Sequence, residues 1–81
     1  MPSIICTCKT IIDYGYIPCN EEWLIISDAK FDKFSGMIDT GNIYRSMDHL
    51  LKCPTCGNLW VFWNGFQNAP TGYGILSEPT K

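Results

Sequence analysis

The amino-acid sequence predicts a small α+β domain, in which a β-sheet carries one or two short helices inserted between two cysteine half-sites. Two observations predict this class: cysteines gather towards both ends of the chain, and strand-like runs flank a helix-like stretch between them. The 81 residues suffice for a single domain, 1–81, and for no second core. A chain this short is only marginally stabilised by apolar packing, so a metal or disulfide is expected to reinforce it.

The strongest motif is the pair Cys53 and Cys56 in the string Cys-Pro-Thr-Cys-Gly. On a tight turn, two cysteines at this spacing direct both sulfur atoms at one metal ion, and Gly57 supplies the left-handed backbone that the turn needs. Residues on both sides favour strands, expected over 49–53 and 58–64. Thioredoxin-like redox sites share the string, but there it opens a helix, which the aromatic and β-branched residues after Gly57 disfavour.

Two further ligands are needed to close a tetrahedral metal site, and Cys6 and Cys8 are the natural candidates. Their spacing is tighter than that of the other pair, and Lys9 stands where a glycine is expected. The segment between Cys8 and Cys53 is long for a zinc site. Its length is explained if the segment forms its own element packed on the sheet.

Cys19 and His49 are the competing ligands. Cys19 follows a proline and precedes polar residues, so a partly buried free thiol in a turn is the favoured interpretation. His49 precedes Cys53 in a predicted strand, and a ring packed beside the site is favoured over a ligand. Either residue could replace Cys6 or Cys8 and leave a site of altered geometry.

The expected location is the cytoplasm. The N-terminal residues show no basic region followed by an apolar one, and no apolar run is long enough to span a membrane. In a reducing compartment, paired thiols bind metal more often than they form disulfides. The expected cofactor is therefore Zn²⁺, with iron as the alternative.

Composition argues against two functional classes. The formal net charge is −2 and the six basic residues are scattered, whereas nucleic-acid binding needs clustered Lys and Arg. A protein partner with a basic surface is a better match. Catalysis has little support, because the chain has one histidine and neither a nucleophile elbow nor a phosphate-binding glycine loop. Four thiolates would also close the coordination shell that a catalytic zinc leaves open, so the chain is expected not to be an enzyme.

Residues 28–38 predict an amphipathic helix with Ser27 as its N-cap. An apolar stripe at helical spacing is expected to pack on the sheet as core. The run 23–27 is apolar up to its last residue, Ser27, and predicts a buried strand. The stripe is Phe31, Phe34 and Ile38, and the other expected elements are strands at 4–8 and 9–13, a second short helix at 43–48, and a loop-like tail 65–81 with a final strand at 73–76.

The aromatic run 59–63 presents apolar residues on both faces of a strand, because alternate side chains point in opposite directions. Two outcomes are open. The helix covers one face while Phe66 and Tyr73 fold over the other, or an aromatic patch stays partly exposed. Such a patch, flanked by acids, suits a protein–protein hot spot. The candidate partner-binding residues are Trp60, Phe62, Trp63, Glu21 and Glu22.

The string Cys-Pro-Thr-Cys-Gly between strands, over residues 49–63, resembles the knuckle of rubredoxins and zinc ribbons. The resemblance implies a zinc-ribbon-like sheet and metal ligation by Cys53 and Cys56, and more loosely by Cys6 and Cys8. Rubredoxins bind iron through two Cys-x-x-Cys-Gly knuckles, a pattern from which the N-terminal Cys-Thr-Cys-Lys departs.

A longer pattern is similar to small bacterial proteins, some of which resemble immunity proteins of polymorphic or contact-dependent toxins. It combines the N-terminal Cys-x-Cys, Asn-Glu-Glu-Trp-Leu-Ile-Ile-Ser-Asp at 20–28, and Leu-Lys-Cys-Pro-Thr-Cys-Gly-Asn-Leu-Trp at 51–60. This resemblance implies a non-enzymatic, zinc-binding interaction module that inhibits a toxin, whose domain would be basic. The alternatives are a rubredoxin-like iron electron carrier and a zinc-ribbon accessory subunit of a nucleic-acid machine.

Overall fold

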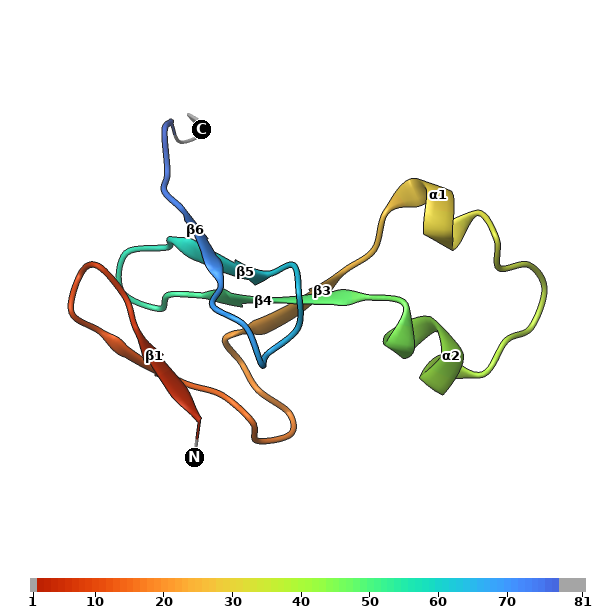
Figure 1. Ribbon diagram of the computed structural model, residues 1–81, viewed down its shortest axis with the longest axis horizontal. Helices are drawn as coiled ribbons and strands as arrows, with labels where there is room; N and C mark the ends of the chain where they lie inside the picture. The colour runs from red at the N-terminus through yellow and green to blue at the C-terminus, as the bar shows by residue number, and fades with distance from the viewer. Residues whose placement is uncertain (1, 78–81) are drawn as a thin grey trace.

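The computed structural model describes residues 2–77, which form a two-stranded hairpin, a four-stranded antiparallel sheet and two short helices (Figure 1). The sheet has the strand order β3-β4-β5-β6, and β1 pairs with β2. The predicted α+β class is confirmed, with strands predominating and both helices lying between the cysteine pairs. The elements are β1 (Ser3–Ile5), β2 (Ile11–Asp13), β3 (Glu22–Ile25), α1 (Asp28–Phe31), α2 (Thr40–Arg45), β4 (Asp48–Lys52), β5 (Leu59–Phe62) and β6 (Thr71–Tyr73).

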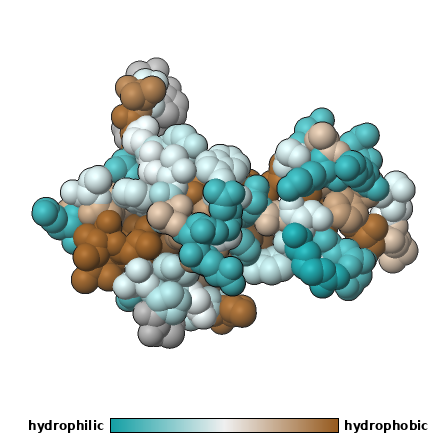
Figure 2. Space-filling view, in the orientation of Figure 1, coloured by the Kyte–Doolittle hydropathy of each residue, from teal (hydrophilic) through white to brown (hydrophobic). Residues whose placement is uncertain are grey.

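The core lies between the hairpin and one face of the sheet, which we call the inner face. Leu51 and Phe62 point inward from β4 and β5, and Ile12 and Tyr14 meet them from the hairpin side. In the hairpin the side chains alternate, so Ile12 is buried while its neighbour Ile11 is exposed. Figure 2 shows the resulting apolar surface over the hairpin. The buried cluster also contains Cys6 and Cys53, so the cysteines belong to the core.

Strand β3 is an edge strand and not the buried strand predicted over 23–27. It pairs on one side with β4, and within residues 2–77 neither α1 nor α2 makes extensive contact with it. Trp23 is consequently 56% exposed, and Leu24 is exposed as well. The continuous apolar run therefore reflects two half-covered faces and not complete burial.

The predicted helix over 28–38 with a stripe packed on the sheet is wrong. The helix does begin where expected, since the Ser27 hydroxyl accepts a hydrogen bond from the Lys30 N–H at 3.2 Å. It ends at Phe31, however, and Gly36 adopts a left-handed φ of 66°, which breaks the helical path. Without a continuous helix the stripe has no common face, and Phe31 is 52% exposed.

Residues 26–47, which we call the arm, join β3 to β4 and project away from the sheet (Figure 1). Neither α1 nor α2 contains a buried residue, and the extensive contacts within residues 2–77 are between neighbouring strands. In the described part of the chain neither helix has the length and apolarity to cross a membrane.

The remaining boundaries differ modestly from those predicted. Helix α2 begins at Thr40 and ends at Arg45, before the predicted limit of 48, because Asp48 already pairs with Ile25 in the sheet. Strands β4 and β5 lie close to their expected positions. The final strand, β6, precedes the predicted segment 73–76 and overlaps it only at Tyr73. It interrupts the predicted loop-like tail, whose residues 78–81 lie outside the described part of the chain.

Candidate metal centre

Four cysteine sulfur atoms meet where the loop between β1 and β2 lies against the turn between β4 and β5. The sulfurs of Cys6, Cys8, Cys53 and Cys56 all lie within 4.8 Å of one another. The closest pairs are Cys6 with Cys56 at 3.5 Å and Cys8 with Cys53 at 3.6 Å. A tetrahedral site with metal–sulfur bonds of about 2.3 Å separates its sulfurs by about 3.8 Å. The cluster can therefore hold one metal ion with little rearrangement.

The second knuckle, residues 53–58, follows directly from strand β4. The Cys53 N–H donates to the Asn58 carbonyl at 2.9 Å, and the Gly57 N–H donates to the Cys53 carbonyl at 3.0 Å. Gly57 has a φ of 80°, as the sequence indicated. A side chain there would be strained by this φ, and its Cβ would also lie 3.0 Å from the Ile75 methyl group.

The first knuckle, residues 6–10, forms the loop of the β1–β2 hairpin. The Cys6 N–H donates to the Thr10 carbonyl at 2.9 Å, and the Lys9 N–H donates to the Cys6 carbonyl at 2.9 Å. Lys9 has a φ of 77°, the left-handed conformation that a non-glycine residue adopts only at a cost. Lys9 therefore adopts the backbone conformation that a glycine would supply at this position.

The two knuckles also contact each other reciprocally. Thr10, which follows the first cysteine pair, donates to Thr55 inside the second pair at 2.8 Å. Asn58, which follows the second pair, donates to Thr7 inside the first pair at 3.3 Å. Each knuckle thus fixes the other through a matching position, which fits the arrangement of the four sulfurs.

The electrostatics of the cluster favour a thiolate at Cys6. Hydrogen bonding from the backbone of Cys8 lowers the pKa of the Cys6 thiol to about 6, against the opposing effect of burial. The Trp60 indole and the neighbouring thiols add to this lowering. A thiol with this pKa is available as a metal ligand at neutral pH.

The two thiols of the second knuckle have pKa values shifted in opposite directions. Burial acts to raise the pKa of Cys53, but backbone hydrogen bonding from Cys56 and Thr55 brings it below the ordinary value. At Cys56 a backbone hydrogen bond from Asn58 acts to lower the pKa, yet burial and the surrounding thiols raise it to about 12. Crowded sulfurs cannot all ionise together, whereas a bound cation would favour the thiolate at each of them.

Burial of the cluster is uneven. Cys6 and Cys53, the first cysteine of each knuckle, are buried, while Cys56 is half-buried and Cys8 is exposed. The four sulfurs suffice to complete a tetrahedral shell around one ion.

The competing ligands lie elsewhere. The Cys19 sulfur interacts weakly with the Asp13 carbonyl at 3.9 Å, and it packs against the core as a half-buried thiol. His49 Nδ1 lies 2.8 Å from a Glu22 carboxylate oxygen, with its ring close to that of Phe66. Neither residue belongs to the sulfur cluster among the described residues.

The candidate partner-binding aromatic residues do not form one patch. Trp60 and Phe62 point to the inner face, where Phe62 is 2% exposed and packs against Tyr14 and Phe66. Trp63 is 48% exposed. Phe66 packs against Phe62 on the inner face, but Tyr73 is opposite Leu59 on the other face of the sheet. The covering predicted for Phe66 and Tyr73 together, with the helix on the opposite face, is therefore wrong.

The two predicted acidic residues make contacts within the protein. The Tyr16 hydroxyl donates to Glu21 at 2.6 Å, which raises the pKa of the tyrosine. Glu22 pairs with His49. Both carboxylates are half-buried, so they present less charge to a partner than two free surface acids would.

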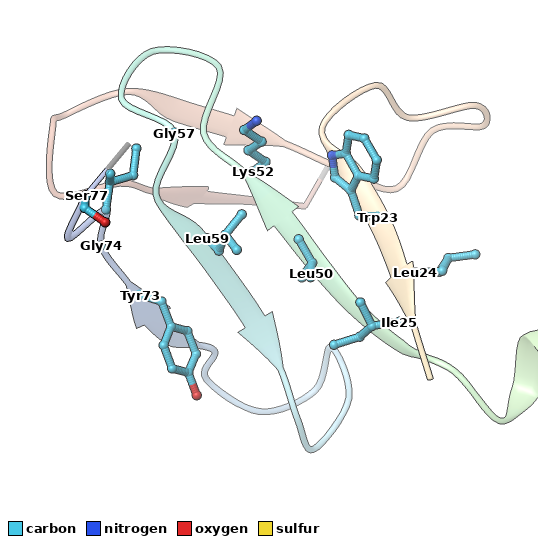
Figure 3. A pocket seen from close by; sticks show the side chains of 11 residues that line it. Trp23, Leu24, Ile25, Leu50, Lys52, Gly57, Leu59, Tyr73, Gly74 and Ser77 are labelled. Carbon is cyan, nitrogen blue, oxygen red and sulfur yellow. The ribbon is translucent and has the colours of Figure 1, made fainter. Parts of the chain in front are cut away.

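Sequence reasoning missed an open groove of about 710 Å³ on the outer face of the sheet (Figure 3). Trp23 and Ile25 from β3 reach this face together with Leu50 from β4. The alternation of these residues with inward-pointing ones could have indicated an apolar outer face. To group them into one groove, however, the order of the strands in the sheet must be known. We call this surface the outer groove; its main apolar residues are Trp23, Ile25, Leu50, Leu59, Tyr73 and Ile75.

The fold and the sulfur cluster define a small, mainly β domain with a four-cysteine site that can hold a metal ion. The chain belongs to the family described as Domain of unknown function (DUF8617), whose model matches residues 2–77. No curated protein and no solved structure is significantly similar to the chain.

Proposed function

We propose that this chain is a non-enzymatic zinc-binding module that presents an interaction surface to a protein partner. The observation that carries the proposal is the convergence of four sulfurs, all within 4.8 Å, from two knuckles distant in sequence. With only a small core beside it, a closed metal site would act chiefly as a clamp that holds the hairpin on the sheet.

Zinc is favoured over iron as the occupant. Four thiolates bind either metal in a tetrahedral shell. The first knuckle departs from the Cys-x-x-Cys-Gly pattern of rubredoxins, which bind iron, and zinc needs no redox partner. Metal analysis of protein purified from cytosol separates the two: zinc gives a colourless protein with one ion per chain, whereas iron gives a red one with a reversible redox wave.

The outer groove is the surface that best suits a partner. Trp23 and Tyr73 are both exposed there, and Tyr and Trp are common among residues that dominate binding energy. The arm carries further exposed apolar residues, such as Phe31 and Met37, which do not line the groove. The more specific form of the proposal is an immunity-type inhibitor of a basic toxin domain. The net charge of −2 supports it, since four thiolates outweigh one divalent ion and make the loaded protein more acidic.

The test is co-expression with the product of a neighbouring gene that ends in a toxin domain. Protection of the host cell and a co-purifying complex are expected, and a Trp23→Ser variant should lose both while it retains its metal. Ile5→Ser, at an exposed hairpin position away from the groove, is the matched control. Retained protection with Trp23→Ser would remove the outer groove from the proposal. Absence of a neighbouring toxin gene would count against the inhibitor function.

A further inference from the structure

Trp60 carries a buried hydrogen-bond donor without an acceptor. Its indole Nε1 has no hydrogen-bond partner among the described residues and is shielded from solvent. A buried N–H that leaves water without a replacement acceptor costs free energy, so such groups are rare in native proteins. The other two tryptophans differ: Trp63 Nε1 donates to the Tyr73 hydroxyl at 3.0 Å, and Trp23 is exposed to water.

The surroundings of Trp60 fix the ring beside the metal centre. Trp60 is opposite Leu51 and Gly72 in the sheet, on the inner face, and packs against the cluster that contains Cys6 and Cys53. A Cβ at Gly72 would lie 2.6 Å from the indole Cζ3 atom. The absence of a side chain at this position on β6 therefore makes room for the ring.

The buried cluster that Trp60 packs against contains two sulfur atoms, those of Cys6 and Cys53, which could accept from this N–H. Of these two sulfurs, Cys6 is the one whose thiol pKa is lowered by hydrogen bonding from the Trp60 indole, which supports it as the acceptor. A neutral thiol is a weak acceptor, whereas a thiolate is a strong one and its hydrogen bonds are charge-assisted. Metal binding keeps the sulfur deprotonated.

We propose that the Trp60 indole N–H donates a hydrogen bond to the Cys6 thiolate of the loaded metal centre, which makes Trp60 a positioning residue for that ligand. The inference rests on the proposed metal site and assigns Trp60 to the support of that site instead of a partner surface. A phenylalanine at position 60 would fill similar space but could not satisfy the thiolate. The indole N–H withdraws electron density from one sulfur and orients it towards the ion.

The first experiment uses the wild-type protein loaded with ¹¹³Cd. A hydrogen bond between an N–H and a metal-bound sulfur transmits scalar coupling from the cadmium nucleus to the indole proton. We expect this coupling at one indole resonance, assigned to Trp60 because Trp60→Phe removes that resonance. Coupling at no indole proton, with cadmium bound to the four cysteines, would overturn the proposal.

The second experiment compares Trp60→Phe with Trp63→Phe and Trp23→Phe, which keep the Trp60 donor. Loss of a hydrogen bond raises the energy of the thiolate lone pairs, so the sulfur-to-metal charge-transfer band of the cobalt-loaded Trp60→Phe protein should move to longer wavelength. Its zinc affinity, measured by competition with a chromophoric chelator, should fall roughly tenfold. Equal bands and affinities in all three variants would contradict the role of Trp60.

The metal site and the Trp60 hydrogen bond are tested by different outcomes. If wild-type protein binds no stoichiometric metal, or binds it equally well without the cysteines, the metal site itself is wrong. If metal binding is intact but Trp60→Phe behaves like the control variants, only the hydrogen bond is wrong. Should Trp60→Phe fail to fold, the coupling in wild-type protein still decides the question, with the indole resonance assigned through its neighbours in the sequence.

Discussion

The two knuckles repeat one pattern of backbone hydrogen bonds, although the first knuckle is one residue shorter than the second. In each, the N–H of the first cysteine donates to the carbonyl of the residue two positions after the second cysteine. The residue directly after the second cysteine donates its own N–H to the carbonyl of the first cysteine. That residue is Lys9, with φ 77°, in the first knuckle and Gly57, with φ 80°, in the second. This hydrogen-bond pattern therefore requires a left-handed backbone at the residue after the second cysteine, and glycine is the easiest residue to place there but not the only one.

The largest expected effect is the loss of both knuckles together on metal removal. Exhaustive treatment with a strong chelator should unfold the domain, because binding free energies of structural zinc sites reach about 10–16 kcal/mol in small peptides. Circular dichroism should show loss of strand signal, with recovery on addition of one equivalent of zinc. Protein that stays folded without metal would show that the knuckles are held by packing alone.

The next effect separates buried from exposed ligands. Cys53→Ser should unfold the domain, because it removes a ligand buried in the core. Cys8→Ser should leave a folded protein with weaker metal binding, since solvent can replace a ligand at the exposed position. Thermal unfolding and zinc content measure both.

Cys19→Ser is the control for these cysteine variants, as it changes a half-buried thiol outside the cluster. It should leave the zinc content unchanged and cost about 1 kcal/mol of stability or less. Loss of zinc from this variant would show that the ligand set is wrong.

A smaller effect is expected at the glycine of the second knuckle. Gly57→Ala should destabilise the domain by about 1–3 kcal/mol, because a left-handed φ strains any side chain and the new Cβ would crowd Ile75. Urea unfolding of the zinc-loaded protein measures it. Gly65→Ala has the same sign of φ, 84°, but open space around its Cβ, so it isolates the backbone contribution.

The smallest effect has the opposite sign. Lys9→Gly should stabilise the domain by about 0.5–1 kcal/mol, because relief of left-handed strain exceeds the extra unfolded-state entropy of glycine. The same urea titration, compared with Lys9→Ala, measures it. Destabilisation by glycine would mean that the Lys9 side chain makes a contribution that the backbone comparison omits.

The four-cysteine cluster was more predictable than its surroundings because its signals are local. The spacing of Cys53 and Cys56, followed by Gly57, specifies a turn that needs no distant residue. Grouping Cys6 and Cys8 with them followed from the demand for four ligands, and the structure brings these four sulfurs together. Cys19 was excluded as a ligand because it follows a proline and precedes polar residues, a pattern typical of a turn.

The arm and the aromatic run were less predictable because their environment is set by distant segments. Phe31 and Ile38 have helical spacing, but the break at Gly36 lies between them. Which face of the aromatic run is covered depends on the hairpin, which brings Tyr14 against Phe62. Alternation along one strand identifies two faces without saying which one meets the rest of the chain.

The pair Ile25 and Asp48 closes the base of the arm, since these residues are opposite each other in the sheet. The residues between them form a single connection between β3 and β4, and neither of its helices contains a buried residue. The entropy of closing such a loop grows only slowly, by about 0.6 kcal/mol for each doubling of its length. Related chains are therefore free to lengthen, shorten or rewrite this insertion while the clamp stays constant, so diversity within the family should concentrate there.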